Sequence, residues 1–96
     1  MTVTVPADHP CLAGHFPGRP VVPAVLLLEL AVTALREQLG PLRISGAPGA
    51  KFLLPVLPDQ PLILTLNADA ARGRAGFRCE SGGALAAHGE LRFDRP

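Results

Sequence analysis

The spacing of hydrophobic and polar residues changes character twice along this chain of 96 residues. Residues 2–5 alternate polar and β-branched side chains, which predicts a short strand. Residues 6–23 then contain five prolines and two glycines. Proline lacks a backbone donor and fixes its own φ, so this segment can be neither a helix nor a central strand. It is predicted to be an irregular loop of the kind that positions functional side chains.

A long helix is predicted after this loop, from Pro23 to the Gly40-Pro41 pair. Proline suits the first turn of a helix, where its missing N–H is not needed, and Gly-Pro is a stop signal. Nearly every position before Arg36 is apolar, including Val25, Leu26, Leu27, Leu28, Leu30, Ala31, Val32 and Leu35. A helix that is apolar all round is expected to be covered on every side.

The second half of the chain alternates with a period of two. Residues 62–69, 74–79 and 85–93 read as strands with one apolar face, separated by turns at 69–73 and 81–83. Residues 41–57 predict a further strand, interrupted around Pro48-Gly49 by a bulge. The pattern therefore predicts an α+β fold, in which a long central helix is wrapped by a curved antiparallel sheet. We expect a single domain over residues 1–96.

Composition and charge exclude two classes of partner. The chain is 48% hydrophobic and 18% charged, has a net charge of +1, and contains no Trp or Tyr. A nucleic-acid binder usually carries a basic stripe with stacking aromatics, so no nucleic acid is expected. The apolar run 21–34 is shorter than the roughly 20 residues of a bilayer span, so no membrane insertion is expected. Low charge on a small domain suggests spare apolar surface, which predicts a homo-oligomer.

Location and cofactors follow from what the chain does not contain. The N-terminus shows no basic region followed by an apolar run, so we expect a cytoplasmic protein. Cys11 and Cys79 have neither C-x-x-C nor metal-ligand spacing, which predicts reduced thiols. There is no ligand cluster and no phosphate-binding glycine loop in the sequence. We therefore expect neither a metal nor a nucleotide cofactor.

Two residues carry the candidate chemistry: His15 in the loop and Glu29 in the apolar helix. A histidine can take a proton from carbon, and a carboxylic acid can give one to a leaving oxygen, which is what a dehydration needs. Burial among leucines would hold Glu29 in its acid form. The plainer interpretations are a structural hydrogen bond for His15 and a paired buried carboxylate for Glu29. Cys11 precedes His15 by four residues, but nothing in the sequence orients that pair for nucleophilic catalysis.

The segment that holds both residues also carries a family resemblance. Residues 14–29, GHFPGRPVVPAVLLLE, resemble the signature of the hot-dog fold β-hydroxyacyl-acyl-carrier-protein dehydratases of fatty-acid synthesis. Within that group the chain looks like the small dehydratases of aryl-polyene and related pigment pathways. Residues 51–58, KFLLPVLP, and 82–91, GGALAAHGEL, resemble further segments of the family. The resemblance covers nearly the whole chain and implies a hot-dog fold.

The resemblance implies roles for particular residues. His15 corresponds to the catalytic histidine and Glu29 to the acidic residue of the helix. The implied substrate-binding residues lie in the loop and at the helix start, where backbone N–H groups hold the thioester carbonyl: Phe16, Gly18, Pro23, Ala24 and Val25. In such enzymes the histidine and the acid of one site come from opposite subunits of a dimer. An acyl carrier protein delivers the substrate on its phosphopantetheine arm, and no other cofactor is implied.

The chain departs from the family pattern at two places. Ala24 stands where the family has glycine, so an added methyl is expected to narrow the pocket or restrict φ. Family members also have a helix and a strand before the segment that begins here at Met1, which predicts an open tunnel wall. These departures leave two alternatives to a dehydratase. One is a hot-dog acyl thioesterase in which Glu29 activates water, and the other is a non-catalytic acyl-binding protein or heterodimer partner.

Three cations are candidates for contact with an acidic carrier protein: Arg19, Arg43 and Lys51. The plainer interpretation is that each is simply solvated, as most isolated surface charges are. The sequence alone does not place them relative to His15 or Glu29. Their position in the fold therefore decides between the two interpretations.

Overall fold

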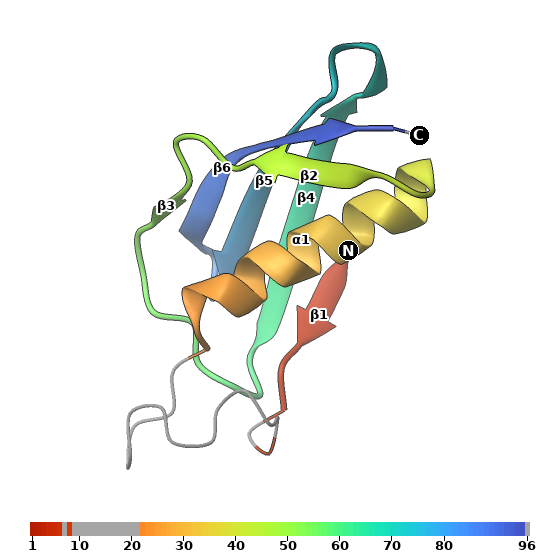
Figure 1. Ribbon diagram of the computed structural model, residues 1–96. Helices are drawn as coiled ribbons and strands as arrows, with labels where there is room; N and C mark the ends of the chain where they lie inside the picture. Colours follow the sequence, from red (N-terminus) through yellow and green to blue (C-terminus); the bar gives the residue numbers. More distant parts are fainter. Residues whose placement is uncertain (7, 9–21, 96) are drawn as a thin grey trace.

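One α-helix, the short 3-10 helix η2 (Ala70–Arg72) and six strands form the described part of the chain, which the computed structural model gives for residues 1–6, 8 and 22–95 (Figure 1). The helix α1 spans Ala24–Leu39. The strands are β1 (Thr2–Thr4), β2 (Arg43–Gly46), β3 (Lys51–Phe52), β4 (Pro61–Asp69), β5 (Arg74–Ser81) and β6 (Ala84–Asp94). All neighbouring strands pair antiparallel, in the order β1-β4-β5-β6-β2. The short strand β3 also pairs with β6, at a different position along it from β2.

The three long strands bury one face each, as the period-two pattern predicts. Leu62 and Leu64 of β4 are buried, and so are Phe77 and Cys79 of the neighbouring strand β5. The register pairs Leu64 directly with Cys79, so these side chains lie on the same face of the sheet. The helix crosses this face, and the apolar core lies between the two layers (Figure 1). The predicted architecture of a long helix against a curved antiparallel sheet is therefore confirmed.

The helix is covered on one side only. Its buried residues include Leu27, Ala31 and Leu35, which recur at the spacing of one helical face. Val25, on the other side, is 61% exposed. The expectation that the helix is covered on every side is therefore wrong for a single chain, because one sheet can shield only one face of a helix. None of the helices in the described part of the chain has the length and apolar character needed to cross a bilayer.

The strand expected over residues 41–57 is two short strands, β2 and β3, that both pair with β6. Pro48 and Gly49 form a turn between them, and Gly49 has a φ of +67°, which favours glycine. The pairing of β5 with β6 shifts register after Cys79, which leaves Ala86 as an extra residue. The carbonyl of Ala86 accepts hydrogen bonds from the chain that follows β3. This bulge helps to hold that chain in place beside the start of the helix.

A candidate active site at the start of the helix

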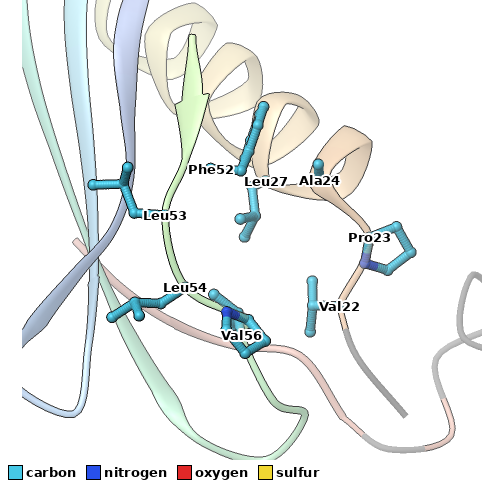
Figure 2. Close-up of a pocket in the computed structure, with 9 residues that line it drawn as sticks. Val22, Pro23, Ala24, Leu27, Phe52, Leu53, Leu54 and Val56 are labelled. Carbon is cyan, nitrogen blue, oxygen red and sulfur yellow. The ribbon is translucent and has the colours of Figure 1, made fainter. Parts of the chain in front are cut away.

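An apolar pocket of about 330 Å³ lies between the start of α1 and the chain that follows β3. Figure 2 shows the two walls, with Val22, Pro23 and Ala24 on the helix side and Leu54 and Val56 on the other. All nine lining residues are apolar: Val22, Pro23, Ala24, Leu27, Phe52, Leu53, Leu54, Pro55 and Val56. A pocket with such a lining suits a hydrocarbon chain better than a polar ligand.

A backbone hydrogen bond joins the two walls of this pocket. The N–H of Val22 donates to the carbonyl of Val56 at 2.7 Å. Both side chains are buried, at 3% and 2% exposure, so the bond is shielded from water. On the second wall, the N–H groups of Leu53 and Leu54 donate to the bulged carbonyl of Ala86 at 2.7 and 3.2 Å. The pocket is thus built by backbone bonds rather than by side-chain packing alone.

The first turn of α1 faces this pocket. Pro23 is the N-cap residue and provides no side-chain hydrogen bond to the turn, which also lacks an acidic residue. The first N–H groups of a helix have no partner within it, and the helix dipole makes this end electropositive. Ala24 has an ordinary helical conformation, because Asp59 is the one non-glycine residue with positive φ among the described residues. The restriction on φ that the alanine methyl group was expected to impose therefore does not arise in this conformation of Ala24.

Glu29 lies away from the pocket, on the open side of α1. It shares a shallow hollow of about 290 Å³ with Val25, Leu28, Val32, Thr33 and Arg36. The side chain is exposed, so the expected burial among leucines is wrong for a single chain. Within the described residues, Glu29 makes no hydrogen bond and no ion pair. The interpretation of Glu29 as a paired structural carboxylate is therefore not supported there.

The structure separates the described site residues into two groups. Ala24 and Pro23 line the pocket, while Glu29 and Val25 lie in the hollow on the other side of the helix. With about 3.6 residues per turn, Ala24 and Glu29 are roughly 140° apart around the helix axis. One chain therefore does not bring its own Glu29 to its own pocket. The remaining predicted residues, His15, Phe16 and Gly18, lie outside the described residues.

Sequence reasoning missed the second wall of the pocket. Phe52, Leu53 and Leu54 are 41%, 52% and 47% exposed, which is unusual for large apolar side chains placed side by side. The signal was present in the sequence as an apolar run that does not alternate and is broken by Pro55 and Pro58. A segment with two prolines and no alternation of polar and apolar residues is not expected to form a strand with one apolar and one polar face. It indicates an irregular apolar segment, which is what forms the wall.

The other candidate residues are also placed by the structure. Arg43, the first residue of β2, pairs with Asp94 at 3.5 Å and does not line the pocket, and both side chains are exposed. Lys51 is the neighbour of Phe52 in β3, and Arg19 lies outside the described residues. Cys79 is fully buried, and this burial raises the pKa of its thiol. The described residues contain no group of three or more His, Cys, Asp or Glu side chains that could hold a metal.

Comparison of the sequence with known proteins identifies its relatives. Residues 1–90 match the model of a family described as ApeI-like, ApeI dehydratase. The chain is 37% identical to the 3-hydroxyacyl-(acyl-carrier-protein) dehydratase FabZ of Thiobacillus denitrificans, over 91% of this chain and 70% of that protein. It is 36% identical to the protein of the same name from Verminephrobacter eiseniae, over 72% of this chain and 53% of that protein. The chain thus spans between about half and about two thirds of the length of these two relatives.

Comparison of the structure shows the fold. A chain of the dehydratase heterocomplex ApeI:P from Xenorhabdus doucetiae superposes with a TM-score of 0.90 at 24% sequence identity. The match covers 98% of this chain and 84% of that chain. The hot-dog fold expected from the sequence is therefore confirmed. The arrangement of the helix on the sheet is therefore one that the two proteins share.

Proposed function

Because the chain belongs to the ApeI-like dehydratase family, we propose that it removes water from a (3R)-3-hydroxyacyl thioester carried by an acyl carrier protein. The product is the trans-2-enoyl thioester. The FabZ relatives named above support this substrate class, which places the reaction in fatty-acid or polyene biosynthesis. The names of these relatives state the substrate. The exposed carboxylate of Glu29 and the apolar pocket support the proposal.

In the proposed mechanism His15 removes the proton from C2 of the substrate. The electron pair of that C–H bond forms the C2–C3 double bond while the C3–O bond breaks. Glu29, as the carboxylic acid, donates its proton to the departing hydroxyl group, which leaves as water. The backbone N–H groups of Ala24 and Val25 stabilise the negative charge that develops on the thioester oxygen. Solvent then returns the proton from His15 to Glu29, so that no net charge accumulates.

The position of Glu29 is the structural observation that carries the proposal of a shared site. An exposed carboxylate stands in the middle of a strip of apolar side chains on the open side of α1, among them Val25, Leu28 and Val32. A second chain packed on this strip would remove Glu29 from water and bring it to a site completed by the other subunit. We therefore assign the acid and the base of one site to different chains of a dimer.

The pocket at the start of α1 receives the acyl chain in this scheme. Its lining is apolar and includes Ala24, the first residue of α1, whose amide begins the helix together with that of Val25. A thioester carbonyl held at those amides would leave its hydrocarbon tail between Leu27 and Phe52. The carrier protein supplies the phosphopantetheine arm, and the chain's own residues supply the acid, the base and the amides.

Incubation with 3-hydroxyacyl carrier proteins of several chain lengths tests the proposal. We expect mass spectrometry to show the loss of one water from the acyl group, with the thioester intact. Release of free carrier thiol would instead identify the chain as a thioesterase. Binding of the acyl carrier without any change of mass would identify a non-catalytic acyl-binding protein. Either of these two results would contradict the proposed reaction.

A further inference from the structure

Three basic side chains lie in one row across the outer face of the sheet. Arg78 of β5 is directly opposite His88 of β6, and His88 is directly opposite Lys51 of β3. Directly paired residues share a face, and the neighbours Phe77 and Cys79 of Arg78 are buried on the inner face. Arg78, His88 and Lys51 therefore point away from the helix layer, and we call them the basic row.

The basic row makes no ion pair within the described residues, although Glu80 lies two residues from Arg78 on the same strand. Neither Lys51 nor Arg78 makes an ion pair there, and both side chains are exposed. Glu90, the next outward residue of β6, is already shared by Arg74 at 3.8 Å and Arg92 at 3.4 Å. Arg78 and Lys51 lie on either side of His88, and no carboxylate of the described residues forms an ion pair with either of them. Both charges are therefore open to an external anion.

The row adjoins the pocket across the edge of the sheet. Lys51 faces outward, while the next residue, Phe52, is paired with the buried Ala87 and lines the pocket. Figure 2 shows Phe52 pointing from β3 toward α1. A ligand bound to the basic row would therefore lie on the other side of β3 from the proposed acyl pocket. Arg43, by contrast, is paired with Asp94 at the far end of β6, and Arg72 lies in the turn between β4 and β5.

We propose that the basic row is the docking surface for an acidic helix of the carrier protein that delivers the substrate, an inference that rests on the proposed function. Neighbouring strands lie about 4.8 Å apart, so the three side chains repeat at nearly that spacing over roughly 10 Å. Carboxylates three or four residues apart on a helix are about 5–6 Å apart. The two spacings match, and electrostatic complementarity of this kind raises association rates. The row contains no aromatic side chain on which nucleic-acid bases could stack.

A matched pair of double variants tests this surface. Lys51→Gln/Arg78→Gln removes two charges from the row, and Arg43→Gln/Arg72→Gln removes two charges from the far end of the sheet. We expect the first variant to raise KM for the carrier-bound substrate about tenfold and the second to leave it within about twofold. Activity on the same acyl group attached to free pantetheine should be unchanged in both. Equal losses in the two variants, or a loss on pantetheine as well, would show that the row is not a docking surface.

A direct binding measurement keeps this inference separate from the proposed function. Fluorescence anisotropy of a labelled bacterial acyl carrier protein, titrated with each variant, reports docking without any turnover. Weaker binding by the row variant alone supports the docking surface even if the unmodified protein dehydrates neither substrate, a result that would overturn the proposed reaction. Equal binding by all variants, or binding of a single-stranded oligonucleotide in preference to the carrier, would overturn the docking surface.

Discussion

Gly89 of β6 and Ala50, the residue before β3, lie in contact on the inner side of the sheet. A Cβ atom placed on Gly89 would lie 2.8 Å from the Cα of Ala50 and 3.0 Å from Cε1 of Phe77. Real Cβ atoms do not approach backbone so closely, and Phe77 is packed in the core. The absence of a side chain at Gly89 therefore sets how near β3, and with it the Phe52 wall of the pocket, can approach the sheet.

We predict that Gly89→Ala destabilises the protein by about 1–3 kcal/mol, the usual cost of forcing extra volume into a packed interior. The matched control is Gly76→Ala in β5, where an added Cβ meets nothing within 4 Å. This control should change stability by less than about 1 kcal/mol, because alanine is more favourable than glycine in a strand. Urea unfolding measures both values. Equal stability of the two variants would mean that the segment at Ala50 can move away at no cost.

The long elements could be predicted from the sequence more reliably than the short ones. The β4–β5–β6 region was predictable because its residues alternate over many positions, as Leu62 and Leu64 illustrate. The two-residue strand β3 was not, because its position depends on the bulge at Ala86 and the contact at Gly89. Both are tertiary features, and no local pattern in the sequence encodes them.

The candidate site was predictable as a set of residues but not as an arrangement. The apolar helix suggested burial of Glu29 because a single sequence does not distinguish a face covered by the same chain from one covered by a second chain. The structure shows that the sheet covers Leu27 and Leu35 and leaves Glu29 exposed. The exposed Phe52 wall was overlooked for a related reason, since an apolar run normally predicts core.

The open strip of α1 predicts assembly. Val32 and Val25 present apolar surface that the described residues do not cover fully, and we expect a dimer at micromolar concentration. Val32→Glu should shift the protein toward monomer and lower activity by at least about tenfold, because a charge would be buried in the interface. Gln38→Glu, at an exposed position near the end of the same helix, is the control. Sedimentation equilibrium checks the prediction, and a fully active monomer would contradict the shared site.

The buried thiol predicts a pH-dependent stability. Burial raises the pKa of Cys79 in the folded state, so folding favours the protonated thiol. The resulting stabilisation is complete below the pKa of the unfolded thiol, about 8.5, and is lost as pH rises through the folded value. In a Cys11→Ala background, unfolding free energy should fall above that pH more steeply than in the Cys11→Ala/Cys79→Ala control. Parallel pH profiles of the two proteins would show that ionisation of Cys79 is not linked to folding.

The proposed proton transfers predict the effect of removing either group. His15→Ala and Glu29→Gln should each lower kcat by roughly 10²–10⁴-fold, the usual contribution of a general acid or base. The matched controls are His9→Ala in the same segment of the sequence and Glu37→Gln, exposed on the same helix. Both controls should retain activity within about twofold, and circular dichroism should show the same fold in all four variants. Near-normal turnover of either His15→Ala or Glu29→Gln would remove that residue from the mechanism.

Mixing the two inactive variants tests whether one site is built from two chains. If His15 and Glu29 of a site belong to opposite subunits, a mixed dimer of His15→Ala with Glu29→Gln has one doubly defective site and one intact site. Random pairing in a symmetric dimer makes about half of the dimers mixed, so activity should recover to roughly a quarter of the unmodified level.

A site built within one chain predicts no recovery, because every site in the mixture would keep one defect. The separation of Glu29 from the pocket of its own chain favours recovery, since the helix itself stands between them. The two purified variants are refolded together, native mass spectrometry counts the mixed dimers, and loss of water from the acyl carrier measures activity. Inactive mixtures that contain the mixed dimer would place both groups in one chain. Recovery in proportion to the mixed dimer would assign the acid and the base to different subunits, because catalysis depends only on the local geometry of each site.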